Sequence, residues 1–295
     1  MLVLFYGEGR LGNQIFQYQA LSSLAGSSDC ILAAGLEDLR SVVETTGPQL
    51  TLVTRSRWVK RCIKYLLVPC LLRPLARTLR LIGYATEHES GHGVRRGASG
   101  QLSLRRGLLA SITFVDGGYY QNADIWPHIF PATSVRLQSS LRSEARRILD
   151  RIGSEWPVFV HVRRGDYLKF SSYGVDDLTL PESFYRAAID EMRQRLPQAH
   201  WMFVTDDPAW VEDHFADVQP RTVTSVSAAL DFAVMTECVA GILSNSTFSL
   251  AAALLLPNPQ LLIGPQYWFG FRVGEWLPPH IRVDHPRMLY LPAVA

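Results

Sequence analysis

Three polar clusters in the second half of this 295-residue chain each follow directly on a short apolar run. The apolar runs have the length and composition of strands buried on both faces of a parallel sheet. Ligands of open α/β sheets bind outside the carboxyl ends of the strands. We therefore expect the three clusters to share one rim and to form one site. The clusters span residues 161–167, 205–207 and 244–247.

The residue types in these clusters indicate an anionic ligand. Arg163 and Arg164 carry guanidinium groups, which bind phosphate oxygens bidentately and keep their charge. Residues 244–247, Ser-Asn-Ser-Thr, stand at a strand-to-helix junction, where hydroxyls and free amides form a phosphate cradle. Two such groups favour a diphosphate.

Each cluster taken alone also has a structural explanation. Residues 244–247 suit a helix N-cap, the paired arginines suit a surface ion pair, His161 suits a buried core position, and Asp206-Asp207 suits a helix cap before Pro208. Their joint occurrence after three strands is what favours a ligand site.

A rival site lies at the amino end. Gly7, Gly9 and Gly12 form G-x-G-x-x-G between a predicted strand and helix, the pattern of dinucleotide-binding folds. In an NAD(P)-dependent Rossmann oxidoreductase, Glu37 or Asp38 would hold the ribose. The alternative is a tight turn without a ligand. The oxidoreductase hypothesis leaves the three later clusters without a role.

Strands that alternate with helices predict an α/β protein with parallel sheets. At this length two domains are expected, and we place the boundary at the Gly153-Ser154 turn, giving domains 1–153 and 154–295. Residues 179–182 read as a capping box that starts a helix. Strands are expected at 2–6, 31–34, 112–115, 158–162, 201–205, 222–226, 240–244 and 261–264, and helices at 15–25, 136–152, 182–196, 208–215, 228–237 and 247–256.

Composition excludes several classes of protein. Apolar residues make up 47% of the chain, charged residues 19%, and the net charge is +2, which excludes a disordered or fibrous chain and argues against general nucleic-acid binding. We find no leader pattern and no apolar run of spanning length. The four cysteines, without metal-ligand spacing, are expected to be reduced thiols in a cytoplasmic protein.

One segment is strongly basic. Residues 55–80, called the basic segment below, contain eight lysines and arginines, and no acidic residue occurs between Glu44 and Glu87. A solvated helix face explains this charge, and so does a patch that contacts an anionic ligand or the inner face of a membrane. Both interpretations stay open here.

Four blocks carry a family resemblance. The blocks are GRLGNQIFQYQAL (9–21), HVRRGDY (161–167), FVTDD (203–207) and SNSTFSLAAA (244–253). Together they resemble the bacterial α-1,2-fucosyltransferases of glycosyltransferase family 11. The resemblance implies a GT-B fold, two Rossmann-like domains facing across a cleft, with an acceptor-side first domain and a second domain that binds GDP-β-L-fucose. It also implies inverting transfer of fucose to the 2-hydroxyl of a terminal galactose in a glycan, free or lipid-linked.

The resemblance assigns roles by position. Arg163 should hold the diphosphate, Asp206 the nucleoside, and Gly12 should help close the cleft from the first domain. The other donor-binding residues implied are Asn13, Gln14, His161, Asp166, Ser244, Asn245, Ser246 and Ser249. Two departures stand out: Glu8 and Arg10 interrupt the glycines before the first block, and Leu250-Ala251 occupy positions that are often aromatic in the family.

Catalytic expectations follow from the same residues. The chain has no D-x-D pair to hold a divalent ion, so we expect transfer without metal or cofactor. Asp166 and Glu8 are the candidate bases, although Asp166 could instead orient Arg163 through a salt bridge, and Arg164 could face a structural carboxylate. A non-catalytic nucleotide- or carbohydrate-binding module is the third alternative to the transferase and the oxidoreductase.

Overall fold

The computed structural model describes residues 1–86, 103–121, 135–153, 156–172, 174–279 and 281–293. The chain forms two compact units, Met1–Arg136 (unit 1) and Leu137–Ala295 (unit 2). No helix among the described residues is long and apolar enough to cross a membrane.

Unit 1 is an α/β layer around a six-stranded sheet with the order β4-β2-β1-β7-β5-β6. All neighbouring strands are parallel except β5 and β6. Val3 and Phe5 of β1 are buried, and α1 is buried along most of its length. The elements are β1 (Leu2–Tyr6), α1 (Leu11–Leu24), β2 (Cys30–Ala34), α2 (Glu37–Val42), β3 (Val43–Thr45), β4 (Gln49–Leu52), α3 (Arg57–Cys62), η1 (Ile63–Leu72), η2 (Pro74–Thr78), β5 (Ile82–Thr86), β6 (Ser103–Arg105), β7 (Leu109–Asp116) and β8 (Val135–Leu137), the last paired with β3.

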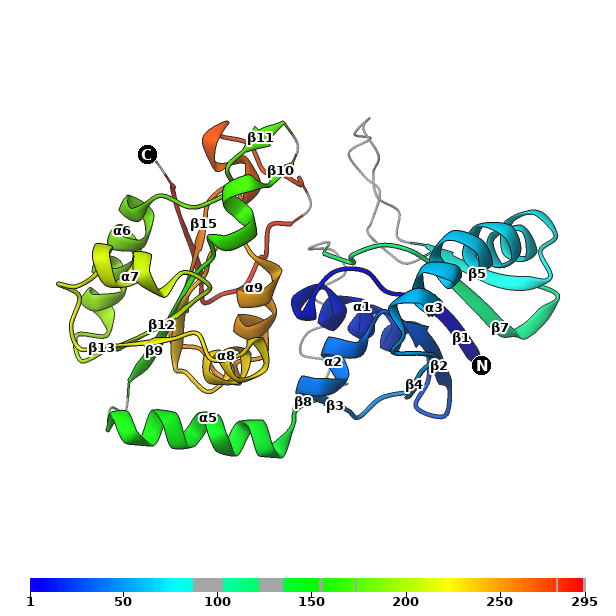
Figure 1. Cartoon of the computed structure of the whole chain (residues 1–295), viewed down its shortest axis with the longest axis horizontal. Coiled ribbons are helices and arrows are strands. Elements are labelled where there is room, and N and C mark those ends of the chain that lie inside the picture. Colours follow the sequence, from blue (N-terminus) through cyan, green and yellow to red (C-terminus); the bar gives the residue numbers. More distant parts are fainter. Residues whose placement is uncertain (87–102, 122–134, 154–155, 173, 280, 294–295) are drawn as a thin grey trace. The chain divides into compact units, whose positions relative to one another are not determined.

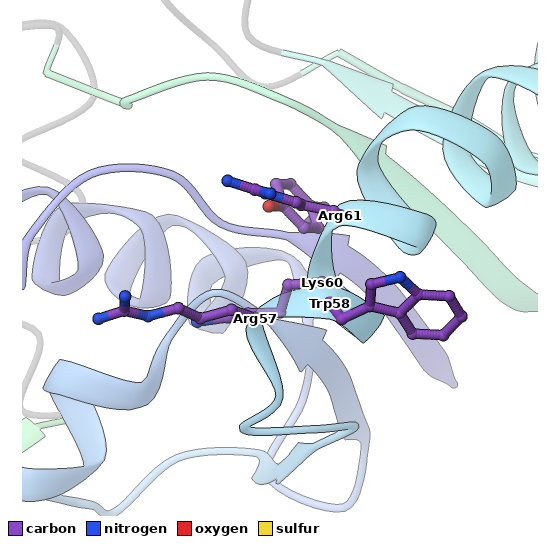
Figure 2. Close-up of a pocket in the computed structure, with 5 residues that line it drawn as sticks. Arg57, Trp58, Lys60 and Arg61 are labelled. Atoms are coloured by element: carbon purple, nitrogen blue, oxygen red, sulfur yellow. The ribbon is translucent and has the colours of Figure 1, made fainter.

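The basic segment forms one nearly continuous helical stretch, α3–η1–η2, of which η1 and η2 are π-helical. Pro69 lies inside η1, where it has no backbone N–H to donate and its ring blocks the regular α-helical hydrogen bond. Val68 and Ala76 pack on Phe114 of the sheet, which fixes the inner face of the stretch. Figure 2 shows Arg57 and Trp58 extending to opposite sides of α3.

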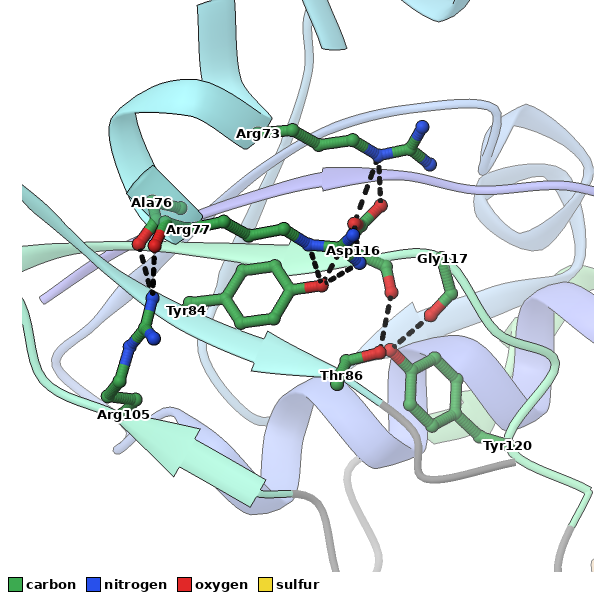
Figure 3. Close-up of polar contacts among 9 residues, drawn as sticks. All are labelled: Arg73, Ala76, Arg77, Tyr84, Thr86, Arg105, Asp116, Gly117 and Tyr120. Atoms are coloured by element: carbon green, nitrogen blue, oxygen red, sulfur yellow. Dashed lines mark hydrogen bonds and ion pairs between the residues drawn. The ribbon is translucent and has the colours of Figure 1, made fainter. Parts of the chain in front are cut away.

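A buried carboxylate anchors this helical stretch to the sheet (Figure 3). Asp116, at the carboxyl end of β7, accepts hydrogen bonds from Arg73 Nε at 3.0 Å and Arg77 Nη2 at 2.9 Å. The Tyr84 hydroxyl of β5 donates to the same carboxylate at 3.0 Å. Two cations of the basic segment are therefore bound within the unit.

Unit 2 contains a second six-stranded sheet, entirely parallel, with the order β13-β12-β9-β14-β15-β16. Figure 1 shows α6 and α7 on one side of this sheet and α8 and α9 on the other. The elements are α5 (Ser139–Ile152), β9 (Pro157–Val162), η3 (Gly165–Lys169), β10 (Ser171–Ser172), β11 (Val175–Asp176), α6 (Glu182–Arg195), β12 (His200–Thr205), α7 (Pro208–His214), β13 (Arg221–Thr224), α8 (Ala228–Thr236), β14 (Ala240–Ile242), α9 (Thr247–Leu254), β15 (Leu262–Pro265), η4 (Phe269–Arg272) and β16 (Met288–Leu291).

Strand alternation divides the core of unit 2 between the two faces of its sheet. Val158, Val160 and Val162 of β9 pack with Tyr185 of α6 and Phe215, just after α7. Successive strand side chains point to opposite faces, so His161 lies on the other face, where its ring meets that of Phe248 in α9 at 5.5 Å. The core thereby fixes which residues of β9 reach α9.

The units divide before α5, whereas the sequence analysis placed the boundary after that helix, at Gly153. Helix α5 packs against α8 of unit 2. Arg142 and Arg146 reach the Glu237 carboxylate at the end of α8, at 2.9 and 2.8 Å. Ser154, the second residue of the expected turn, lies outside the described residues.

The predicted elements agree with the structure in unit 2 and only partly in unit 1. All nine strands and helices predicted between residues 158 and 264 appear within a few residues of their expected bounds. The capping box at 179–182 is wrong in detail: Pro181 is the N-cap, and Thr179 bonds Asp177 instead. In unit 1 the sequence analysis missed β4, β5 and the helical stretch, because basic and apolar residues alternate there without a helical or strand period.

Candidate functional site

The sheet order of unit 2 brings the three predicted polar clusters together. Strands β12, β9 and β14 are neighbours and run in the same direction, so their carboxyl ends meet at one rim. Residues 163–167 follow β9, residues 206–207 follow β12, and residues 243–246 follow β14. The prediction that these clusters share one rim is confirmed, and we call this site the strand-end rim.

A buried hydrogen bond joins β9 to the segment after β14. His161 Nδ1 and Ser244 Oγ lie 2.8 Å apart, and both residues are buried. Burial, with a further contribution from the nearby Arg163 charge, lowers the pKa of His161 to about 3. The imidazole is therefore neutral at physiological pH and fixes the position of the Ser244 hydroxyl without adding charge.

Arg163 is held between two carboxylates at the rim. Its Nη1 lies 2.8 Å from Asp206 Oδ2, and its Nη2 lies 2.6 Å from Asp166 Oδ1. The guanidinium also lies 5.6 Å from the centre of the Tyr167 ring. The expected salt bridge between Asp166 and Arg163 is present. It orients a guanidinium whose side chain is 19% exposed, so the Arg163 side chain is not fully covered by the unit.

Asp206 links the end of β12 to the backbone after β9. Its Oδ1 accepts from the Arg164 amide at 2.8 Å and from the Gly165 amide at 3.3 Å. A Cβ at position 165 would lie 2.6 Å from Asp206 Oδ2, so glycine allows this close approach. Both carboxylate oxygens of Asp206 thus have partners within unit 2, and its contact with a nucleoside stays a prediction.

Arg164 has a structural role. Its Nε lies 3.1 Å from Asp207 Oδ2, and its guanidinium stacks 4.3 Å from the Trp210 ring centre. Asp207 also caps α7 by accepting from the Trp210 amide at 3.2 Å. The expectation that Arg164 faces a structural carboxylate is confirmed, and Arg163 remains the arginine of the pair that is predicted to face a ligand.

The segment after β14 builds the start of α9. Ser246 is the N-cap of this helix and accepts from the Phe248 amide, while Ser249 Oγ donates to the Ser246 carbonyl at 3.1 Å. Asn245 Nδ2 donates to the Leu178 carbonyl at 2.9 Å. Asn245 Oδ1 is buried and has no hydrogen-bond partner in the described part of the chain. These side chains are rigidly held, and the helix amides add partial positive charge at the rim.

Two further contributors complete this rim: Tyr167, which belongs to the first predicted cluster but was given no role there, and a segment after β15 that was not predicted. The Tyr167 hydroxyl donates to the Asn245 carbonyl at 3.2 Å, and burial raises the pKa of Tyr167 to about 12. After β15, Tyr267 and Trp268 adopt φ values of 69° and 53°, a region that side-chain-bearing residues rarely occupy. Phe269, which follows them, contacts the Tyr167 ring at 6.1 Å. The strand-end rule that identified the three clusters also applies to β15 and would have found this segment.

The candidate residues of unit 1 are held within their own unit. Gln14 donates to the Gly9 carbonyl and Asp38 Oδ2, and it accepts from the Leu39 amide at 2.9 Å. Asn13 Oδ1 accepts from Gln121 at 2.7 Å. Glu8 forms an ion pair with Lys64 at 2.6 Å and is 44% exposed. Their contribution to a donor pocket remains a prediction.

The glycine-rich turn works as a strand-to-helix connection. Gly9 has φ +87°, which glycine adopts without strain, and α1 begins two residues later. Glu37, a candidate ribose ligand of the oxidoreductase hypothesis, accepts from the Gly35 amide and pairs with Lys60 at 3.0 Å. Asp38 accepts from Gln14. Both acids already have partners inside the unit.

Comparisons with known proteins support one family. The model of "Glycosyl transferase family 11" matches residues 99–269, more than half of the chain. The O-antigen biosynthesis glycosyltransferase WbnK of Escherichia coli is 29% identical over 116 residues, which are 38% of each protein. The galactoside alpha-(1,2)-fucosyltransferase 2 of Pongo pygmaeus is 24% identical over 307 aligned positions, covering 96% of this chain and 76% of that protein. The matched segment therefore spans little more than a third of the first relative and three quarters of the second.

A solved structure supports the fold. The family 9 glycosyl transferase from Veillonella parvula superposes with a TM-score of 0.54 at 10% identity, covering 98% of this chain and 86% of that one. Two Rossmann-like α/β units, as expected for the GT-B class, are thereby confirmed, and the family match favours glycosyl transfer over the oxidoreductase hypothesis. From the family model and the four sequence blocks together, the chain belongs to glycosyl transferase family 11.

Proposed function

We propose that this enzyme transfers L-fucose from GDP-β-L-fucose to the 2-hydroxyl of a terminal galactose, with inversion at the anomeric carbon. Family membership and the alpha-(1,2)-fucosyltransferase relative support the reaction class. The observation that carries the proposal is the strand-end rim, where Arg163 and the start of α9 stand at neighbouring strand ends.

The rim residues have complementary roles toward the donor. The Arg163 guanidinium, oriented by Asp206 and Asp166, would bind the diphosphate. The α9 amides would add partial positive charge to the same group. Ser244, oriented by neutral His161, and Asn245 would complete the pocket with a hydroxyl and a free amide oxygen.

In the reaction, the acceptor oxygen forms a bond to the fucosyl anomeric carbon while the bond from that carbon to the β-phosphate oxygen breaks. The departing GDP keeps the electron pair, so negative charge grows on the diphosphate in the transition state. A cation held in place before the reaction stabilises that charge without reorganising. The proton of the acceptor hydroxyl passes to a base, with Asp166 and Glu8 as the candidates.

We propose that transfer needs no divalent metal, because the arginine and the helix amides supply the positive charge. Turnover should therefore be unchanged by EDTA and should not rise on adding Mn²⁺ or Mg²⁺. Activity that EDTA abolishes and Mn²⁺ restores would refute metal independence while leaving the fucosyl transfer intact.

The four cysteines are free thiols, which fits a reducing compartment such as the cytoplasm.

The reaction is tested by incubating the full chain with GDP-fucose and a panel of β-1,3- and β-1,4-linked galactosides. NMR should identify an α-1,2-linked fucose and release of one GDP per transfer. Binding of GDP-fucose without any product across the panel would support the non-catalytic module instead. Calorimetric binding of NAD in place of GDP-fucose would revive the oxidoreductase hypothesis.

A further inference from the structure

The outer face of the α3–η1–η2 stretch exposes an unusual amount of apolar surface. Seven of the fifteen large apolar side chains that are exposed among the described residues lie between positions 53 and 79. Trp58, Tyr65 and Leu66 are 73%, 63% and 61% exposed, and Leu71 and Leu79 are about half exposed. We call these five side chains the apolar stripe. Soluble monomers rarely gather so many exposed apolar side chains unless the surface binds something.

The inner face of the same stretch already has its partner. Val68 and Ala76 are buried against the sheet of unit 1, and Ile63, Leu72 and Leu75 pack around them. The apolar stripe is therefore a second face, in excess of what unit 1 needs to hold the helix in place. Its solvent exposure follows from the helical stretch covering the sheet with one side only.

The charges of the basic segment divide into two groups. Lys60, Lys64, Arg73 and Arg77 form ion pairs with acidic residues of unit 1. The other four are exposed and form no ion pair among the residues that the structure describes: Arg55, Arg57, Arg61 and Arg80. Of the eight basic residues in the segment, four therefore remain without an ion pair among the described residues.

A cavity joins some of these cations to the apolar stripe. Its volume is about 430 Å³, and Tyr6, Arg57, Trp58, Lys60 and Arg61 line it (Figure 2). Guanidinium groups bind phosphate oxygens bidentately, and aromatic rings such as Trp58 suit the boundary between apolar and aqueous phases. The cavity has the charge and size to receive one phosphate-bearing headgroup.

We propose that the outer face of the α3–η1–η2 stretch binds the surface of an anionic lipid bilayer. The apolar stripe would lie at the boundary of headgroups and acyl chains, and Arg55, Arg57, Arg61 and Arg80 would contact lipid phosphates. An anionic bilayer fits better than a protein partner because the face has cations and apolar groups and no acidic residue within the segment. The attachment is peripheral, and it does not depend on the proposed reaction.

Vesicle binding of the full chain tests the proposal. We expect the protein to float with phosphatidylcholine vesicles that contain about 30–40% phosphatidylglycerol. It should float little with vesicles of phosphatidylcholine alone. Binding should weaken as the salt concentration rises from about 0.05 to about 0.5 M, because salt screens exposed charges. Each arginine near an anionic surface strengthens binding about fivefold, so R57Q/R61Q should bind about 25-fold more weakly.

Matched variants separate this face from a general charge effect. Arg147 and Arg151 of α5 are exposed and have the same i,i+4 spacing as Arg57 and Arg61, so R147Q/R151Q should keep wild-type binding. W58S/L66S should weaken binding to anionic vesicles by roughly tenfold or more, because less apolar area is then buried at the bilayer surface. V226S/V273S changes exposed apolar residues of unit 2 and should leave binding to anionic vesicles unchanged. Unfolding midpoints check that each variant folds.

Three results would overturn the proposal. The first is negligible flotation with anionic vesicles at low salt. The second is equal weakening by R57Q/R61Q and R147Q/R151Q, which would indicate nonspecific attraction. The third is a concentration-dependent dimer in sedimentation velocity that W58S/L66S dissociates, which would assign the apolar stripe to a second copy of the chain.

Discussion

The two sheets of this enzyme have similar topology and different carboxyl ends. At the rim of unit 2, side chains from neighbouring strands bind one another: His161 meets Ser244, and Arg163 meets Asp206. At the carboxyl end of the unit 1 sheet, Asp116 binds Arg73 and Arg77, which belong to the helical stretch over the sheet. The first network orients an arginine whose side chain is not fully covered, whereas the cations of the second network attach a helical stretch to the sheet. Polar residues at the ends of parallel strands thus anchor a helix in unit 1, whereas in unit 2 they form the site where we propose that the ligand binds.

The largest effect is expected from the catalytic base. Loss of general-base assistance costs about 10² to 10⁴ in rate, so D166N should lower kcat by that range if Asp166 takes the acceptor proton. Asp166 and Glu8 are both about half exposed and both paired with a cation. E8Q is the matched variant and should lower kcat less than tenfold, about. If D166N keeps substantial turnover and E8Q abolishes it, the base lies in unit 1 and the division of roles between the units is reversed.

Substitution of Arg163 should have the next largest effect on kcat. Removing one group that stabilises transition-state charge costs about 10² to 10³ in kcat, so R163A should lose that much, and R163K should recover little because the guanidinium fork is absent. R193A, which removes an exposed arginine of α6 paired with Asp190, is the control and should stay within about threefold of wild type. Steady-state kinetics decide this, and near wild-type kcat/KM in R163A would remove the arginine from the mechanism.

The buried imidazole of His161 should make the stability of unit 2 sensitive to acid. Its folded pKa of about 3 lies below the unfolded value of about 6.5, so only the unfolded chain takes up this proton as pH falls below 6.5. Its contribution to stability is complete above that pH and is lost progressively down to about pH 3. At pH 5 the loss is about 2 kcal/mol. H161N cannot titrate, so its stability difference from wild type should shrink by about 2 kcal/mol between pH 8 and pH 5 in urea unfolding.

Parallel pH curves for the two proteins would contradict the buried, neutral imidazole. The comparison is between two chains at each pH, so acid effects from the remaining carboxylates cancel. Asparagine keeps a polar atom near the position of His161 Nδ1, which limits the loss of the contact with Ser244.

Asp116 should affect stability and leave turnover nearly unchanged. D116N removes the countercharge of Arg73 and Arg77, and because both arginines are about half exposed we expect a modest loss of about 1–2 kcal/mol. D190N, at an exposed ion pair of α6, should cost less than 0.5 kcal/mol, roughly. A drop in kcat/KM above about tenfold with an unchanged unfolding midpoint would show that the unit 1 carboxyl end takes part in the reaction.

The sequence predicted unit 2 much better than unit 1 for a physical reason. Buried parallel strands are continuous apolar runs, and β9, β12 and β14 follow that pattern, so the rim could be located from strand ends alone. The basic segment has no such period, because it carries one apolar face toward the sheet and a second toward solvent. The ion pairs of Lys60, Lys64, Arg73 and Arg77 join residues far apart in the chain, and no spacing rule predicts them.

Within the rim, the residue types predicted where the polar side chains lie better than they predicted which groups these side chains contact. The positions of Arg163 and Ser244 were predicted, and so was the structural role of Arg164. The two amide contacts of Asp206 were not predicted, because they depend on the close approach that Gly165 allows. The backbone of Tyr267 and Trp268 could not be read either, since nothing in the residue types requires a positive φ there.

Calorimetric titration of GDP into wild type, R163A and R193A determines whether the strand-end rim binds the nucleotide diphosphate. We expect wild type and R193A to bind one GDP per chain. R163A should bind GDP more weakly by about tenfold or more, because one charge-assisted phosphate contact is lost. Equal affinity of all three proteins for GDP would place the diphosphate away from Arg163 and rule out the proposed role of this arginine in donor binding.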